Sequence, residues 1–282
     1  MALSIEASLQ QGFGLNQPVY YLLLFAGTVV YYTSAYTQDH SYALQNQRNR
    51  WFLHHKKSVF YSQWGTSLLF IIATAIFLQQ HYLTILEMEG KEWLMLLLFP
   101  LIAFGYNSSI RFPIKQFNLR KIGWLKPFVI GFVWCGVVTV YPLLFKSLEV
   151  GQHYHPGLTN WLFVLQNAFF ISILCILFDI KDYAADHNSA LKTFVVRLGL
   201  RKTIFHIIFP LVFVGFLFFI LFALNRHLPL IIILINTVPF LLLIIVSWSM
   251  QRRKTILYYL AIIDGLMFVK AACGIIGSLL LK

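Results

Sequence analysis

Residues 204–224, which read IFHIIFPLVFVGFLFFILFAL, decide the fold class of this chain. The run contains no Asp, Glu, Lys or Arg, and it has the length of roughly 20 residues that a helix needs to cross a bilayer. Backbone amides find no water in lipid, so such a run must satisfy its own hydrogen bonds as a helix. The sequence therefore predicts a transmembrane helix here.

The rest of the chain repeats this pattern. Of its 282 residues, 59% are hydrophobic and only 11% are charged, whereas a soluble domain carries roughly 25% charged residues. We predict a single domain over residues 1–282, an all-α polytopic transmembrane bundle of about eight spans. The predicted spans are 18–36, 58–79, 92–110, 125–145, 158–180, 204–224, 229–249 and 255–281.

The positive charge is confined to alternate loops. The net charge of +12 comes mainly from loops 37–57, 111–126, 181–203 and 250–254, and the loops between them are poor in Lys and Arg. This distribution is typical of membrane proteins, so we expect no nucleic-acid partner. The positive-inside rule places these basic loops in the cytoplasm. No targeting presequence is evident, which favours a prokaryotic inner (plasma) membrane.

The N-terminus fits this topology poorly. Eight spans place both termini outside, yet the segment from Ala2 to Gln17 is mixed in composition and too short to cross. One hypothesis is that the chain lacks most of a ninth, N-terminal helix. The alternative is that a short N-terminus is translocated after synthesis.

Three aspartates at the end of a predicted span carry the clearest chemical signal. Asp179, Asp182 and Asp186 are spaced i, i+3, i+7, which puts them on one face of a continuous helix. Carboxylates this close repel one another unless a cation lies between them, and Mg²⁺ prefers carboxylate and phosphate oxygens. The pattern predicts a platform for Mg²⁺ and a diphosphate, with Lys192 and Arg197 near the phosphate. The alternative is a solvated helix end.

Residues 178–199 resemble the second aspartate-rich motif of the UbiA family of membrane prenyltransferases. That motif has the form D-x-x-D-x-x-x-D, followed by a Lys/Arg-Thr pair and a short run that ends in Leu-Gly. The matching residues are Asp179, Asp182, Asp186, Lys192, Thr193, Leu198 and Gly199. Residues 106–145 resemble the family's middle cytoplasmic loop and the span that follows it.

The resemblance implies a fold of nine helical spans and a reaction in the membrane. The family transfers a polyprenyl group from its diphosphate to an aromatic or other acceptor, such as a quinone precursor, with membrane lipid around the site. It implies Mg²⁺ as the cofactor, held by Asp182 and Asp186 with Asp179 as a third ligand or close neighbour. The residues expected to contact the diphosphate are Lys192, Arg197, Arg111 and Lys115.

The chain departs from the family at the first aspartate motif, which has the form N-D-x-x-D-x-x-x-D. The corresponding residues 31–40 read YYTSAYTQDH and contain a single acid, Asp39. One hypothesis is that basic residues just after this stretch hold the diphosphate in place of one Mg²⁺. A second is that the chain is a catalytically silent relative that binds isoprenoid lipid or partner proteins.

Two charged residues, Asp264 and Lys270, lie inside the last predicted span. Charge inside a bilayer is costly and usually faces other helices. The two are six residues apart, hence on different helix faces, so we predict that each has a partner on another helix. Such residues are also found in transporters, which gives a third interpretation of the chain.

Overall fold

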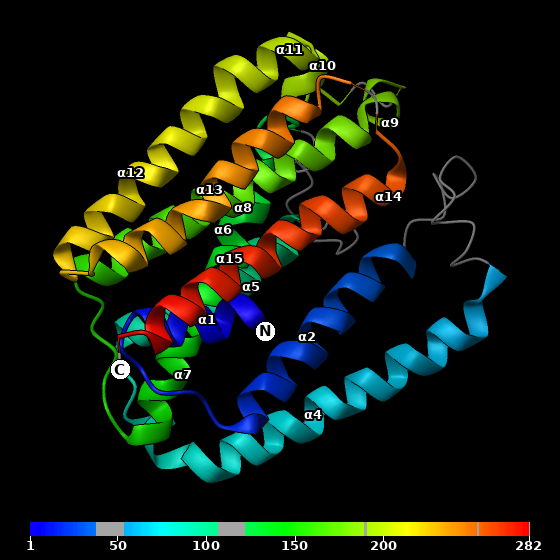
Figure 1. The fold of residues 1–282 in the computed structure, drawn as a ribbon. Helices are drawn as coiled ribbons and strands as arrows, with labels where there is room; N and C mark the ends of the chain where they lie inside the picture. The colour runs from blue at the N-terminus through cyan, green and yellow to red at the C-terminus, as the bar shows by residue number, and fades with distance from the viewer. Residues whose placement is uncertain (38–53, 107–121, 189–190, 253, 282) are drawn as a thin grey trace.

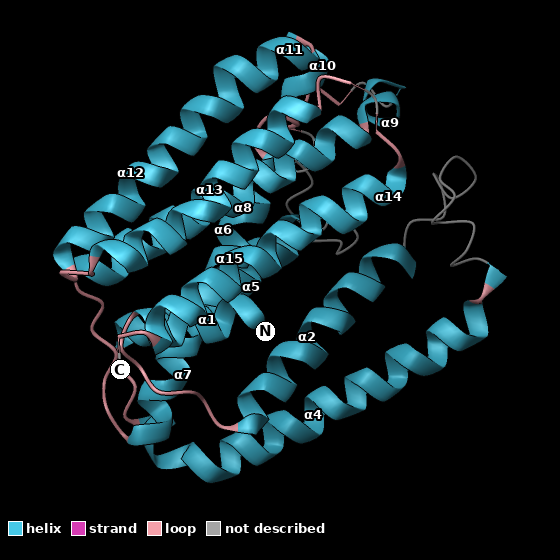
Figure 2. Ribbon diagram, viewed as in Figure 1, coloured by secondary structure: helices cyan, strands magenta, loops and turns pink. Residues whose placement is uncertain are grey.

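The computed structural model describes residues 1–37, 54–106, 122–188, 191–252 and 254–281. Within these ranges every regular element is a helix (Figure 2), which confirms the predicted all-α class. The helices are α1 (Ala2–Gln10), α2 (Pro18–Thr37), α4 (Lys56–Leu86), α5 (Gly90–Tyr106), α6 (Lys126–Cys135), α7 (Tyr141–Val150), α8 (Leu158–Lys181), α9 (Tyr183–Asn188), α10 (Phe194–Leu198), α11 (Leu200–Thr203), α12 (Phe209–Asn225), α13 (Leu230–Ser249), α14 (Ile256–Tyr258) and α15 (Asp264–Leu279).

Three short π-helical turns join some of these helices end to end. They are η2 (Gly136–Val140) between α6 and α7, η3 (Ile204–Ile208) between α11 and α12, and η4 (Tyr259–Ile263) between α14 and α15. Counted through these turns, six helices in the described part of the chain are long and apolar enough to cross a membrane. Their bounds are Lys56–Leu86, Lys126–Val150, Leu158–Lys181, Leu200–Asn225, Leu230–Ser249 and Ile256–Leu279.

The two remaining predicted spans also coincide with helical backbone. Residues 18–36 lie in α2, and the described part of 92–110 lies in α5. Large apolar side chains cover the outside of the molecule, above all on α4, where Phe60, Trp64 and Ile71 are exposed. A continuous apolar surface of this kind is expected on a protein whose neighbour is lipid rather than water. The chain is therefore an α-helical membrane bundle.

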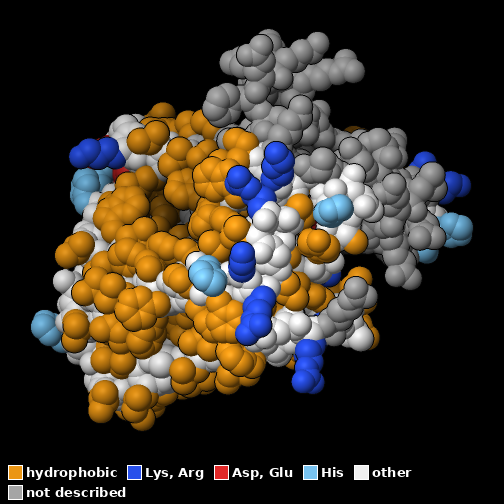
Figure 3. Space-filling view, turned by 90° about the horizontal axis from the view of Figure 1, so that it is seen from above, with side chains coloured by type: hydrophobic (Ala, Val, Ile, Leu, Met, Phe, Trp, Pro, Cys, Tyr) orange, Lys and Arg blue, Asp and Glu red, His pale blue; other side chains and the backbone are white. Residues whose placement is uncertain are grey.

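The helices run alternately in opposite directions, so their connections gather at two ends (Figure 1). We call one of these the basic end, because basic side chains are spread across it (Figure 3). Its described Lys and Arg residues are Lys56, Lys57, Lys126, Lys181, Lys192, Arg197, Arg201, Lys202, Arg252 and Lys254. The opposite end carries four acids, Glu87, Glu89, Glu92 and Glu149, against three described basic residues, Lys91, Lys146 and Arg226. Charge alternation along the sequence thus becomes a charge difference between the two ends.

Helix α1 is short and buried against α15 and η2. Its Glu6 Oε1 lies 2.7 Å from Lys270 Nζ, and its Gln10 Nε2 donates to Asn236 Oδ1 at 2.7 Å. The predicted partner for Lys270 on another helix is thereby confirmed. The helices approach this closely because Gly274 has no side chain; a Cβ there would lie 2.4 Å from Glu6 Cγ.

Helix α8 lies at the centre of the bundle and determines where the aspartates lie. It packs against α6 on one side and α12 on the other, and Phe163, Phe170, Ile173 and Leu177 on it are fully buried. Most of the helix is buried, although Trp161 and Leu165 are exposed, and Asp179 in its last turn is buried as well. That turn carries Asp179 to the interior of the basic end.

Candidate functional site

The last turn of α8 brings a carboxylate and an ammonium together. Asp179 is 3% exposed, and its Oδ1 accepts a hydrogen bond of 2.7 Å from Nζ of Lys126, the first residue of α6. The same Nζ lies 4.0 Å from Oδ2 of Asp186, which is also buried. One lysine is therefore close to two of the three motif aspartates. We call Lys126, Asp179 and Asp186 the Lys126 cluster.

The third aspartate, Asp182, turns away from this cluster. The expected continuous helix is interrupted there, since α8 ends at Lys181 and α9 begins at Tyr183. The Asp182 side chain is 41% exposed, and its nearest cation is Lys181, at 3.5 Å. Aspartate tends to occupy helix ends, because its carboxylate competes with the helix for backbone hydrogen bonds. Asp179 and Asp186 are therefore buried beside one ammonium, whereas Asp182 lies at the break between the two helices with its side chain partly exposed.

Close packing between α6 and α8 places Lys126 beside Asp179. Gly131 of α6 lies against Ser172 of α8, and a Cβ on this glycine would lie 2.1 Å from the serine Oγ. Pro127 suits the first turn of α6, where its missing N–H would have no helical partner. A side chain at residue 131 would push the two helices apart and separate the ion pair.

The segment after α9 packs against α6 and the residues just before it. A Cβ at Gly123 would lie 2.5 Å from the Lys192 carbonyl carbon, so the chain before α6 runs directly against this backbone. Phe194 packs edge-on against Phe128 of α6, at 6.0 Å between ring centroids. Thr193, between them, is fully buried.

Some polar atoms near this junction are buried without a hydrogen-bond partner among the described residues, and two of them matter here. They are Oδ2 of Asp179 and Oγ1 of Thr193. Buried polar atoms nearly always have a partner, which can be water or a ligand. These two oxygens can therefore receive a donor that is not among the described residues, such as a water molecule or a ligand.

Two of the four residues expected to bind diphosphate lie in the described part of the chain. Lys192 and Arg197 lie at the basic end with exposed side chains, the latter on α10. Their charge is available to a ligand at the surface. Arg111 and Lys115 lie outside the described residues, as does Asp39 in the stretch that replaces the first aspartate motif.

The described residues do not form the magnesium site that the resemblance implies. Mg²⁺ requires several oxygen ligands at about 2.0–2.1 Å in octahedral geometry. Asp179 already binds an ammonium through Oδ1, Asp186 lies 4.0 Å from the same ammonium, and the Asp182 side chain is 41% exposed. Within the described ranges, no three His, Cys, Asp or Glu side chains are arranged to hold a metal ion. The donor set as folded fits an internal lysine and not a divalent cation.

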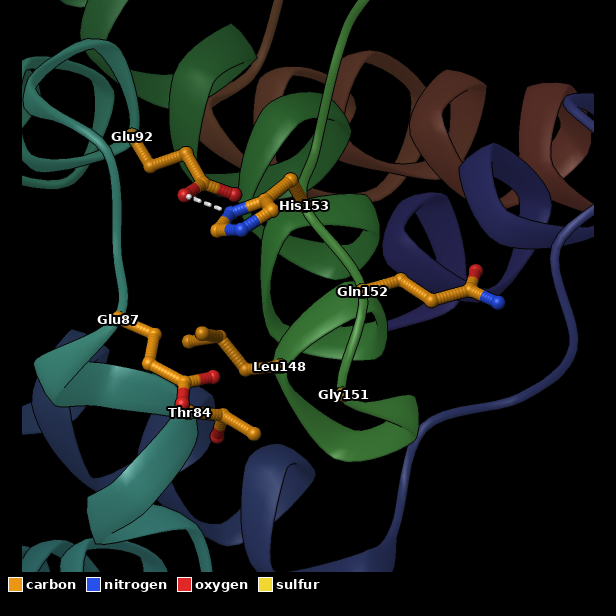
Figure 4. A pocket seen from close by; sticks show the side chains of 7 residues that line it. All are labelled: Thr84, Glu87, Glu92, Leu148, Gly151, Gln152 and His153. Atoms are coloured by element: carbon orange, nitrogen blue, oxygen red, sulfur yellow. Dashed lines mark hydrogen bonds and ion pairs between the residues drawn. The ribbon is translucent and has the colours of Figure 1, made fainter.

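A second polar group lies at the opposite end, around a small pocket (Figure 4). The Glu92 carboxylate accepts hydrogen bonds from the Tyr154 amide at 2.6 Å and the Glu89 amide at 2.8 Å, and lies 3.1 Å from His153 Nδ1. The hydrogen bond to Glu92 raises the pKa of His153 above its ordinary value. Gly151, at φ +68°, ends α7 and starts this loop. The group ties the 151–157 loop to α5.

Two important partners were missed by sequence reasoning. The charge pattern identifies Lys126 only as a loop charge, although a basic residue at the first position of an apolar span, beside Pro127, is a usable signal. Nothing in the sequence links Glu6 to Lys270, because 264 residues separate them. Comparison of the chain with protein-family models, curated proteins and solved structures gave no match.

Proposed function

We propose that this chain is a membrane prenyltransferase of the UbiA type, which moves a polyprenyl group from its diphosphate to an aromatic or quinone-precursor acceptor. One observation carries the proposal. The segment that resembles the family's second aspartate motif lies at the basic end, with Asp179 and Asp186 buried together and Lys192 and Arg197 exposed nearby. A motif that was only a solvated helix end would not bury two carboxylates.

The proposal includes a topology. All eight predicted segments cross the bilayer of a prokaryotic inner membrane, and the basic end lies on its cytoplasmic side. The segments are 18–36, 58–79, 92–110, 125–145, 158–180, 204–224, 229–249 and 255–281. The positive-inside rule supports this orientation. A water-soluble diphosphate then reaches the site from the cytoplasm, while the apolar prenyl tail stays among the helices.

The chemistry suits the charges at this end. The bond between the prenyl C1 and a diphosphate oxygen breaks, and the oxygen keeps the electron pair. The acceptor forms a new bond to C1 and loses a proton. Because negative charge gathers on the leaving group, fixed cations aimed at it stabilise the transition state more than the ground state. Lys192 and Arg197 supply such cations, with Arg111 and Lys115 as candidates from the neighbouring loop. Since the folded donor set does not fit Mg²⁺, no step is assigned to that ion.

The experiment uses the full chain in lipid nanodiscs with geranylgeranyl diphosphate and candidate quinone precursors, with and without Mg²⁺. We expect release of diphosphate that falls about a hundredfold or more in an Asp179→Asn, Asp186→Asn double variant, because these carboxylates hold Lys126 and position the motif segment. The matched control is Glu87→Gln, an acid at the opposite end, which should keep full activity. Helicity and elution volume must be unchanged in both variants. No release in any condition by folded protein would refute the proposal.

One observation favours a second candidate, a catalytically silent relative that binds isoprenoid lipid or partner proteins. Residues 31–40 lack paired carboxylates, and Lys126 already neutralises part of the second motif. In the same experiment this candidate predicts saturable binding of geranylgeranyl diphosphate without its consumption.

A further inference from the structure

We infer that Lys126 takes the place of a divalent cation between Asp179 and Asp186, and so excludes Mg²⁺ from the carboxylate pair. Lys126 is then a positioning residue for the proposed site. This inference rests on the proposed function only in treating the cluster as the end of the molecule that faces the diphosphate.

The geometry of the ammonium carries the argument. Lys126 Nζ is 2.7 Å from Asp179 Oδ1 and 4.0 Å from Asp186 Oδ2, so one ammonium is within ion-pair distance of both carboxylates. A hydrogen bond of this length between two ionised groups is among the stronger kinds. Two carboxylates buried side by side repel each other unless a positive charge separates them. Here the chain supplies that charge from its own side chain.

Burial makes the arrangement exclusive. The Lys126 side chain is 21% exposed, and those of Asp179 and Asp186 are 4% and 11% exposed. Charges screened so little by water interact strongly, and an ammonium would repel a divalent cation at the same oxygens. Mg²⁺ also gives up its water reluctantly. An incoming ion would therefore have to displace a lysine that is covalently attached.

The backbone keeps the lysine in this position. The contact between Gly131 and Ser172 fixes α6 against α8, and the contact between Gly123 and the Lys192 backbone fixes the chain before α6. The lysine therefore starts from a rigid helix end. Asp182 does not compensate as a metal ligand, because its carboxylate is exposed and lies beside Lys181.

The test measures ion binding directly, with Mn²⁺ as the probe and electron paramagnetic resonance as the readout, on the full chain in nanodiscs without prenyl substrate. We expect wild type to hold no stoichiometric Mn²⁺ at the carboxylate pair. Lys126→Met keeps a side chain of similar length and removes its charge. This variant should bind one Mn²⁺ at least about tenfold more tightly than wild type does. Adding Asp186→Asn to that variant should abolish the new site.

Two controls separate charge from disruption. Lys126→Arg keeps the positive charge and should behave as wild type. Lys181→Met removes a neighbouring lysine that pairs with exposed Asp182, and it too should gain no site. If Lys126→Met does not fold, Lys126→Gln replaces it. If neither variant folds, Mn²⁺ binding by wild type is the test, since the absence of a stoichiometric Mn²⁺ site there supports the inference.

Stoichiometric Mn²⁺ binding by wild type that is lost in Asp179→Asn would overturn the inference, and so would a folded Lys126→Met that binds no more tightly than wild type. Because prenyl substrate is absent, neither result bears on whether prenyl transfer occurs. Conversely, a failure to release diphosphate in the experiment above leaves the ion measurement valid. The two claims can therefore fail separately.

Discussion

Replacement of Glu6 by Gln should destabilise the folded protein by about 3–5 kcal/mol, the usual cost of leaving one member of a buried ion pair without its partner. The geometry of this pair supports a loss of stability near the upper end of that range. Lys270 Nζ and Glu6 Oε1 are 2.7 Å apart, and the two side chains are 5% and 1% exposed. Lys270 also lies near the faces of Phe163 and Phe170, with centroids at 5.5 and 5.8 Å. These rings replace only a small part of a lost counter-charge.

The assay is unfolding by sodium dodecyl sulfate, followed by circular dichroism in mixed micelles. Glu6→Gln, Lys270→Met and the double variant form a mutant cycle. Since a buried pair replaced as a whole is often neutral, the double variant should be more stable than Glu6→Gln alone. The matched control is the exposed pair Lys181–Asp182, at 3.5 Å, whose disruption should cost no more than about 1 kcal/mol. Additive effects in the Glu6 cycle, each below about 1 kcal/mol, would refute the reasoning.

Two further predictions concern the opposite end and the packing of α1. Because Glu92 raises the pKa of His153, their interaction is fully present below the ordinary histidine pKa of 6.5 and is lost as pH rises through the raised value. The wild-type unfolding midpoint should therefore fall over that window, and identical pH profiles for wild type and His153→Gln would contradict this. Gly274→Ala should destabilise by about 1–3 kcal/mol, because its Cβ would collide with Glu6. Gly265→Ala, which meets nothing within 4 Å, is the control, and equal unfolding midpoints would argue against close α1–α15 packing.

Composition and periodicity were enough to establish the helical class and the position of the helices. Uninterrupted apolar runs such as 204–224 have only one stable form in lipid, so the described part of each predicted range falls mainly on helical backbone. The alternation of basic loops likewise predicted which connections meet at one end. These features depend on local sequence and on the solvent, and both can be inferred from the chain alone.

The partners of the charged residues depended on the tertiary structure. Spacing placed Asp179, Asp182 and Asp186 on one helix face, but the helix breaks at Asp182, and a lysine 53 residues before Asp179 joins the other two. Glu6 reaches Lys270 across almost the whole chain. Sequence spacing predicts the relative positions of side chains only within one helix. Burial in a medium without water forces each remaining charge to find an opposite charge, and helix packing at Gly131 and Gly274 decides which charges come within reach.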